Sequence, residues 1–184
     1  MLKRRDFLIR AGAFGIGLLA GMRSWAAALL ATEPNPLGPY YRKGAPFRTK
    51  LAEGVQGTPL GISGKVLSVD GTPLKGAVLD LWHADTKGNY DNESDKFLCR
   101  GCVKTDENGA YAFETIAPGH YFMGDEARPS HIHYKVDAEG CKTLVTQLYF
   151  KGDPWLATDP LDRASLIIEP KDGKGCFDIV LEKA

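Results

Sequence analysis

Short runs of β-type residues, separated by turn signals at close intervals, occupy most of the chain beyond residue 60. The run over 62–69 alternates its side chains with a period of two, and the turn at 70–73 ends it. No long stretch there has the 3.6-residue period of an amphipathic helix. Many short strands with frequent turns predict an all-β domain, either a sandwich or a barrel.

The expected strands share this alternation or a short apolar run beside a turn. They are 62–69, 77–82, 102–105, 110–116, 131–136, 143–150, 166–169 and 177–181. The turns at 106–109, 137–140 and 171–175 join three successive pairs of these strands as hairpins. Residues 32–60 are rich in proline and glycine without a clear period, so we expect a covering loop or arm there.

The N-terminus resembles a targeting signal. A basic start at 3–5 precedes an apolar run at 11–22 and small residues at 26–28. The sequence RRDFL at 4–8 resembles the twin-arginine signature of exported proteins. Because a spanning helix requires about 20 apolar residues, we expect a cleavable signal over 1–31 and no stable membrane insertion after cleavage. The remaining domain, 32–184, is then periplasmic or extracellular, with an uncleaved anchor as the alternative.

Charge is unevenly distributed along the 184 residues, which leave room for one domain and a short leader. Residues 1–26 hold five of the 23 basic residues but one of the 23 acidic residues, so the remainder carries a net charge of −4. A mildly acidic body argues against nucleic acid as the partner.

Four cysteines lie in the expected mature domain: Cys99, Cys102, Cys141 and Cys176. An even number in an exported protein favours structural disulfides, although three pairings are possible. The C-x-x-C spacing at 99–102 would also suit zinc or redox chemistry. A zinc site would require a second close pair, and a redox motif usually opens a helix, so we favour disulfides.

Two histidines, His131 and His133, alternate on one expected strand. Residues i and i+2 of a strand point to the same face, so both imidazoles can reach one point. The plainer interpretation is a half-buried polar face. Arg128 precedes the pair closely, and the strand over 143–150 follows it as the second half of a hairpin.

The sequence leaves open which metal such a pair would bind. No carboxylate lies in a suitable place for the two-histidine-one-carboxylate triad of Fe(II) oxygenases. Tyrosine is the remaining anionic donor, and two phenolates would balance much of the charge of Fe(III). Tyr90 and Tyr121 both follow turn-like segments, but spacing alone does not select them because buried tyrosines more often serve packing.

The stretch from 80 to 153 resembles the core of the intradiol ring-cleavage dioxygenases, the family of catechol 1,2-dioxygenase and protocatechuate 3,4-dioxygenase. The matching segments stand in family order: LDLWHAD at 79–85 with GNY at 88–90, TDENGAYAF at 105–113, TIAPGHY at 115–121, RPSHIH at 128–133 and TQLYF at 146–150. Upstream, GPYY at 38–41 resembles the family's entry segment.

The resemblance implies a β-sandwich of mostly antiparallel strands with long covering loops, holding one non-heme Fe(III). By motif, the iron ligands would be Tyr90, Tyr121, His131 and His133. Tyr121 would dissociate and act as a base when substrate binds. Arg128 would face the bound ring, and Gln147 would lie just outside the ligands. The implied reaction cleaves a small aromatic diol between its two hydroxylated carbons with O₂, giving a muconate-type diacid.

The sequence also departs from the family. Phe122-Met123-Gly124 replaces the proline that often follows the tyrosine, so substrate choice is not settled. The roles of His83 and His120, and association into a homo-oligomer, also stay open. Two alternatives remain. One is a non-catalytic, transthyretin-like binding module, which residues 63–78 resemble. The other is a zinc or copper site at the histidine pair.

Overall fold

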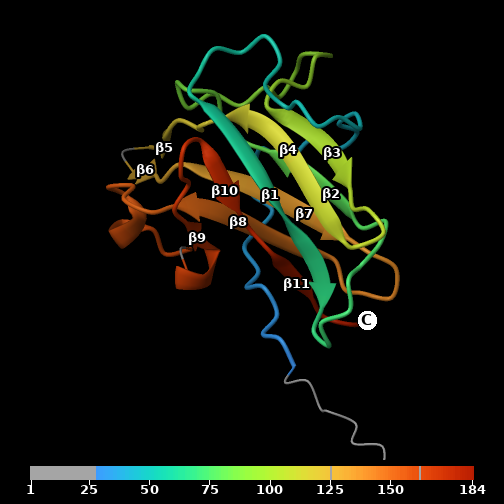
Figure 1. Ribbon diagram of the computed structural model, residues 1–184. Coiled ribbons are helices and arrows are strands. Elements are labelled where there is room, and N and C mark those ends of the chain that lie inside the picture. Colours follow the sequence, from blue (N-terminus) through green and yellow to red (C-terminus); the bar gives the residue numbers. More distant parts are fainter. Residues whose placement is uncertain (1–27, 125, 162) are drawn as a thin grey trace, which may run out of the picture.

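A computed structural model of the chain describes residues 28–124, 126–161 and 163–184. The predicted signal therefore lies, up to residue 27, outside the described residues. Two sheets face each other, and a small hairpin lies at one end (Figure 1). No α-helix occurs in these three ranges, and none of their helical turns is long and apolar enough to cross a membrane.

The first sheet has the order β3-β2-β7-β8-β9. Its members, in that order, are Arg100–Lys104, Val78–Trp82, His131–Asp137, Leu144–Phe150 and Ile167–Ile168. β2, β3, β7 and β8 pair in antiparallel fashion, whereas β9 runs parallel to β8. The predicted hairpin of β7 and β8 is confirmed, with His133 opposite Gln147.

The second sheet is built around β1 (Pro59–Ser68). β4 (Ala110–Ile116) pairs antiparallel with β1, while β10 (Lys174–Cys176) and β11 (Ile179–Leu181) pair in parallel with its first and second halves. The hairpin at the end of the sandwich consists of β5 (Tyr121–Met123) and β6 (Glu126–Arg128).

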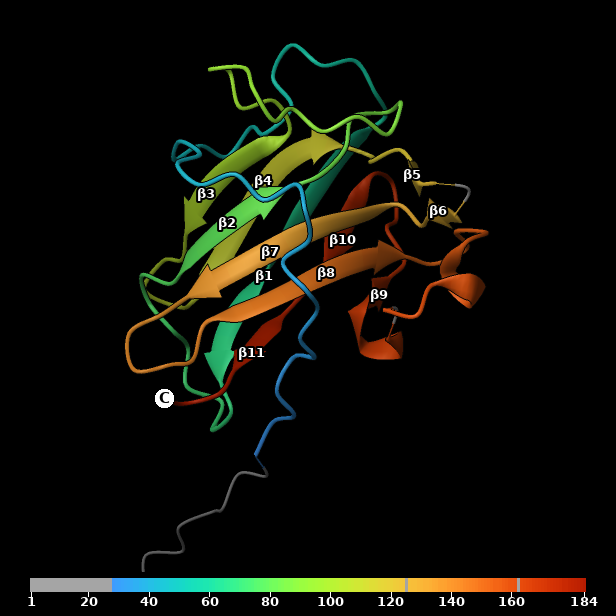
Figure 2. The ribbon, with the colours of Figure 1, turned by 180° about the vertical axis from the view of Figure 1, so that it is seen from behind.

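Period-two alternation builds the core between the sheets. β1 buries Ile62 and Val66, and β4 buries Phe113, against the buried Ile132 and Tyr134 of β7. Burial of each large apolar side chain stabilises the fold by about 1.5–3 kcal/mol. Since successive residues of a strand point to opposite faces, the odd-numbered histidines of β7 point away from this core. The chain before β1 crosses this outer face of β7 and β8 (Figure 2).

The predicted all-β sandwich is confirmed, and the structure corrects its details. β10 begins inside the segment predicted as a turn and extends one residue beyond it, because β1 supplies its partner from a distant part of the chain. Two short 3₁₀ helices, η1 (Leu156–Thr158) and η2 (Ala164–Leu166), follow β8, and η2 includes the start of the predicted strand 166–169. The sequence analysis missed the hairpin of β5 and β6.

The prediction of disulfides is wrong, since all four cysteines are free thiols. Cys99 is buried before β3, where its amide donates to the Leu51 carbonyl. The Cys102 thiol donates to the Ala45 carbonyl at 3.4 Å. The other two cysteines lie on separate elements, beside the C-terminal residues and on β10.

Candidate active site

Two histidines of β7 meet on the outer face of the first sheet. Both side chains are buried, and their Nε2 atoms lie 3.1 Å apart. Trp82 stacks on His133 with ring centroids 4.7 Å apart, and a Cβ atom at Gly38 of the covering arm would lie 3.4 Å from the same imidazole. Strand geometry therefore directs the two rings to one point, and the arm shields that point from water.

Hydrogen bonding and burial leave these imidazoles neutral. His131 Nδ1 donates to the Pro129 carbonyl at 2.6 Å, so its Nε2 carries a free lone pair. Burial lowers the pKa of His131 to about 4. Burial, reinforced by the neighbouring His131 and Arg128, lowers the pKa of His133 well below its ordinary value. Neutral imidazoles with a free lone pair are the form that binds metals.

Tyr90 brings a third donor atom to the same point. Its hydroxyl oxygen lies 3.2 Å from His133 Nε2 and 3.4 Å from His131 Nε2. The turn before it is fixed by Asp85, whose carboxylate accepts backbone hydrogen bonds from Lys87 and Asn89. Burial, and secondarily Tyr121, raises the pKa of Tyr90, so this phenol stays protonated at neutral pH unless a cation binds it.

Tyr121 lies beside these three donors. Its ring centroid is 5.5 Å from that of Tyr90 and 5.6 Å from that of His131. The register of β5 and β6 places it opposite Arg128, whose Nη1 donates to the Tyr121 hydroxyl at 3.3 Å. Burial raises the pKa of Tyr121, and the positive charge of Arg128 opposes that rise.

Close contact between the segments that carry Tyr90 and Tyr121 depends on two glycines. Gly88 has a φ of +83°, and a Cβ atom there would lie 2.0 Å from the carbonyl oxygen of His120. At Gly119, a Cβ atom would lie 2.6 Å from the Thr86 carbonyl oxygen. Real Cβ contacts are essentially never shorter than 3.0 Å, so only glycine permits this approach at both positions.

A buried network holds Arg128. Its Nε donates to Asp159 at 2.5 Å, and its Nη2 donates to Gln147 at 3.3 Å and to Tyr149 at 3.5 Å. The Asp159 side chain has no exposed area, and that of Arg128 is 13% exposed. Burial alone would lower the pKa of Arg128, but Asp159, together with Tyr121 and Tyr149, outweighs this effect and raises it. The sequence analysis missed Asp159, because an acidic residue in a polar turn resembles a solvated one.

The two remaining histidines lie outside the cluster of donor atoms. His83 is buried and links its own strand end to β4 through the Thr115 hydroxyl at 2.6 Å. His120 pairs with Asp153 at 2.8 Å, and the same carboxylate oxygen accepts the Ser130 amide at 2.9 Å. Asp153 therefore ties the segment before Tyr121 to the segment that leads into β7.

The donor set fits a hard trivalent cation. Three donor atoms, two nitrogens and one phenolic oxygen, lie 3.1–3.4 Å from one another in a buried site, and a second phenol lies beside them. In the described part of the chain, no group of three or more histidine, cysteine or acidic residues could hold a metal. A metal bound here would therefore take phenolate oxygens as its anionic ligands.

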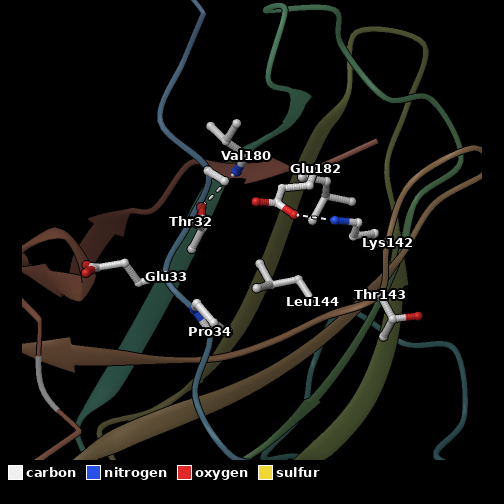
Figure 3. A pocket seen from close by; sticks show the side chains of 10 residues that line it. Thr32, Glu33, Pro34, Lys142, Thr143, Leu144, Val180 and Glu182 are labelled. Atoms are coloured by element: carbon white, nitrogen blue, oxygen red, sulfur yellow. Dashed lines mark hydrogen bonds and ion pairs between the residues drawn. The ribbon is translucent and has the colours of Figure 1, made fainter. Parts of the chain in front are cut away.

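A pocket of about 440 Å³ adjoins the cluster. It lies between β6 and η1, and Glu126, Arg128, Trp155 and Asp159 are among its lining residues; we call it the Arg128 pocket. Another pocket, of about 330 Å³, lies between the arm, β8 and β11 (Figure 3). The interactions drawn there, Lys142 with Glu182 and Thr32 with Val180, pair its polar groups with one another.

The structure thus brings together all six residues that the resemblance selected: Tyr90, Tyr121, Arg128, His131, His133 and Gln147. Their roles stay predictions.

Residues 37–175 match the sequence profile of a family described as Dioxygenase.

Individual relatives agree with this match. The 6-chlorohydroxyquinol 1,2-dioxygenase of Cupriavidus pinatubonensis is 32% identical, over 97% of this chain and 75% of its own length. The chlorocatechol 1,2-dioxygenase of Rhodococcus opacus is 35% identical, over 66% of this chain. This chain spans 57% of the length of that second relative.

Solved structures share the fold. The dioxygenase domain of a fusion with a carbohydrate-binding protein, from Streptomyces sp. SirexAA-E, superposes with a TM-score of 0.75 at 39% identity, covering 84% of this chain and 99% of that one. Hydroxyquinol 1,2-dioxygenase from Pseudomonas putida DLL-E4 gives a TM-score of 0.78 at 27% identity, covering 85% of this chain and 68% of that one.

Proposed function

This chain belongs to the intradiol ring-cleavage dioxygenase family, and from that premise we propose that it cleaves a catechol-type ring between its two hydroxylated carbons. One O₂ is consumed, and both of its atoms enter the muconate-type diacid. The observation that carries the proposal is the convergence of His131 Nε2, His133 Nε2 and the Tyr90 hydroxyl within 3.1–3.4 Å. A non-catalytic binding module is not favoured, since the relatives are named dioxygenases.

The proposed cofactor is one non-heme Fe(III) per chain, with Tyr90, Tyr121, His131 and His133 as its ligands. The buried imidazoles are neutral and need no deprotonation, whereas each phenol must lose its proton when the cation binds. Bound there, the ferric ion would be chelated by the two catechol oxygens and would withdraw electron density, which makes the ring reactive toward O₂. Its positive charge offsets the burial that holds the phenols protonated in its absence.

Tyr121 is the residue proposed to move a proton. Its hydroxyl oxygen already accepts a hydrogen bond from Arg128, which favours the phenolate. In that form, Tyr121 Oη accepts a proton from a hydroxyl of the incoming catechol. The negative charge then resides on the substrate, where the fixed guanidinium of Arg128 stabilises it. Gln147 holds Arg128 Nη2 in place, and the arm, whose Gly38 lies against His133, excludes water.

Activity assays on two variants test the assignment. Tyr121→Phe should lower kcat for catechol by about 100-fold or more, because the proton acceptor is lost. His133→Ala should lose both iron and activity. Tyr41→Phe is the matched control: Tyr41 donates to Asp80 at 3.0 Å, outside the cluster, so its loss should change kcat by less than about threefold.

Oxygen consumption and muconate absorbance give the rates, and elemental analysis gives the metal. Either site variant with wild-type activity would remove the assignment. Zinc or copper at about one per chain, in protein produced with ample iron, would contradict the proposed cofactor.

We also propose that residues 1–31 direct export and are cleaved, leaving 32–184 as the enzyme outside the cytoplasm. The basic start, the short apolar run and the twin-arginine-like sequence support this proposal. The mass of the protein recovered from the periplasm or medium tests it. A full-length protein that stays with the membrane would contradict it.

A further inference from the structure

The Arg128 pocket borders the proposed catalytic site at one residue. Arg128 is the residue that both share, because it lines the pocket and also donates to the Tyr121 hydroxyl. Trp155, whose surface is 40% exposed, forms an aromatic part of the wall. A substituent that points from a ring bound at Tyr121 toward Arg128 would be directed at this pocket, whose volume of about 440 Å³ accommodates a small polar group.

Among the described residues that line this pocket, Arg128 is the only basic one, and Asp159 balances its charge. Arg128 Nε is bonded to Asp159 at 2.5 Å, Nη1 to Tyr121, and Nη2 to Gln147 and Tyr149. All three nitrogens therefore have acceptors, and the two-pronged face that binds a carboxylate is already taken. Arg163 lies outside the lining, where it donates to the Pro160 carbonyl and pairs with Glu33 at 3.9 Å.

Glu126 adds an unbalanced negative charge. It is the exposed first residue of β6, two positions before Arg128, and it lines the same pocket. With Arg128 and Asp159 cancelling each other, the described residues of the lining carry one net negative charge. A carboxylate entering the pocket would lose hydration, could not form a two-pronged pair with Arg128, and would be repelled by Glu126.

Resting on the proposed function, we infer that this enzyme selects catechols whose ring substituent is uncharged, and that the Arg128 pocket discriminates against a carboxylate substituent. Glu126 is the specificity-determining residue. Hydroxyl, alkyl and amide groups fit the lining, whereas a benzoate-type substrate is disfavoured.

Two substrates of the same shape isolate the charge: 3,4-dihydroxybenzoate and its uncharged amide, 3,4-dihydroxybenzamide. The wild-type iron enzyme should cleave the amide with a kcat/KM at least about tenfold higher than the benzoate. Glu126→Lys reverses the unbalanced charge, and at an effective dielectric constant of about 20 this should lower the ratio by about tenfold or more. Added salt should lower the wild-type ratio, because Glu126 is exposed to solvent.

Glu114→Lys is the matched control. Glu114 is an exposed glutamate of β4, in the other sheet, so the same change of charge there should leave the ratio unaltered. Equal or better cleavage of the benzoate by the wild type would overturn the inference, as would equal ratios in the two lysine variants. Cleavage of catechol but of neither substituted compound would also overturn it, while leaving the proposed function standing. No cleavage of any of the three would overturn the proposed function itself.

Discussion

The contact between the two tyrosine-bearing segments depends on Gly88, and an added methyl group tests it. In Gly88→Ala, the new Cβ would lie 2.0 Å from the His120 carbonyl oxygen, where at least 3.0 Å is needed. The two segments must therefore separate by about 1 Å, which moves Tyr90 relative to Tyr121. A displacement of about 1 Å in a catalytic constellation lowers the rate by about 100-fold.

Backbone strain alone cannot explain such a loss, and Gly140→Ala provides the comparison. Gly140 has a φ of +70°, close to the +83° of Gly88, but nothing lies within 4 Å of its Cβ position. Each variant should lose about 1–2 kcal/mol of unfolding free energy from the left-handed conformation. Only Gly88→Ala should also lower kcat/KM for catechol and alter the iron spectrum.

Steady-state kinetics on iron-loaded protein, together with thermal unfolding, separates the two effects. The reasoning would be refuted if the kcat/KM of Gly88→Ala lay within about threefold of that of Gly140→Ala. In that case the close approach of the segments would not position the tyrosines.

Other buried contacts around the site give measurable outcomes as well. Asp159→Asn leaves the buried Arg128 without its counter-charge and should lower the unfolding free energy by about 3 kcal/mol or more in urea titrations. Glu169→Gln, which breaks an exposed pair with Lys151, should change it by less than about 1 kcal/mol; equal losses would contradict this account. Burial lowers the pKa of His83 to about 4, so the unfolded chain binds that proton first and stability falls as the pH drops from about 6.5 to 4. Between pH 7 and 4.5, His83→Gln should make the loss of unfolding free energy about 2 kcal/mol smaller than in the wild type. An unchanged pH dependence of stability would exclude His83 as its source. Removing iron with a chelator should lower the Tm, since a metal that binds only the folded chain stabilises it, and an unchanged Tm would argue against a bound ion.

Local patterns predicted the parts of the fold that depend on neighbours in sequence. The period-two alternation of β1, and the hairpin that sets His133 opposite Gln147, could be predicted because each is contained within one strand or one turn. β10 could not, because Lys174–Cys176 has no strand-like pattern of its own and pairs with β1 more than a hundred residues earlier. The disulfide prediction failed for a related reason, since composition does not say which thiols meet.

The residues of the candidate site divide in the same way, into those that a local pattern predicts and those that meet through contacts distant in sequence. The shared face of His131 and His133 follows from strand geometry alone. Tyr90 and Tyr121 were selected by resemblance, because their meeting depends on contacts between segments about thirty residues apart, at Gly88 and Gly119. No local signal marks Asp159, which reaches Arg128 from the turn after η1.

The central claim is that Tyr90 and Tyr121 bind Fe(III) as phenolates beside the two histidines. The visible absorption spectrum of the purified iron-loaded protein, before and after anaerobic addition of catechol, tests it most directly. We expect a red-brown protein whose tyrosinate charge-transfer band moves to longer wavelength when catechol binds. A colourless protein with one iron per chain would contradict the tyrosinate ligands, and the proposed mechanism with them.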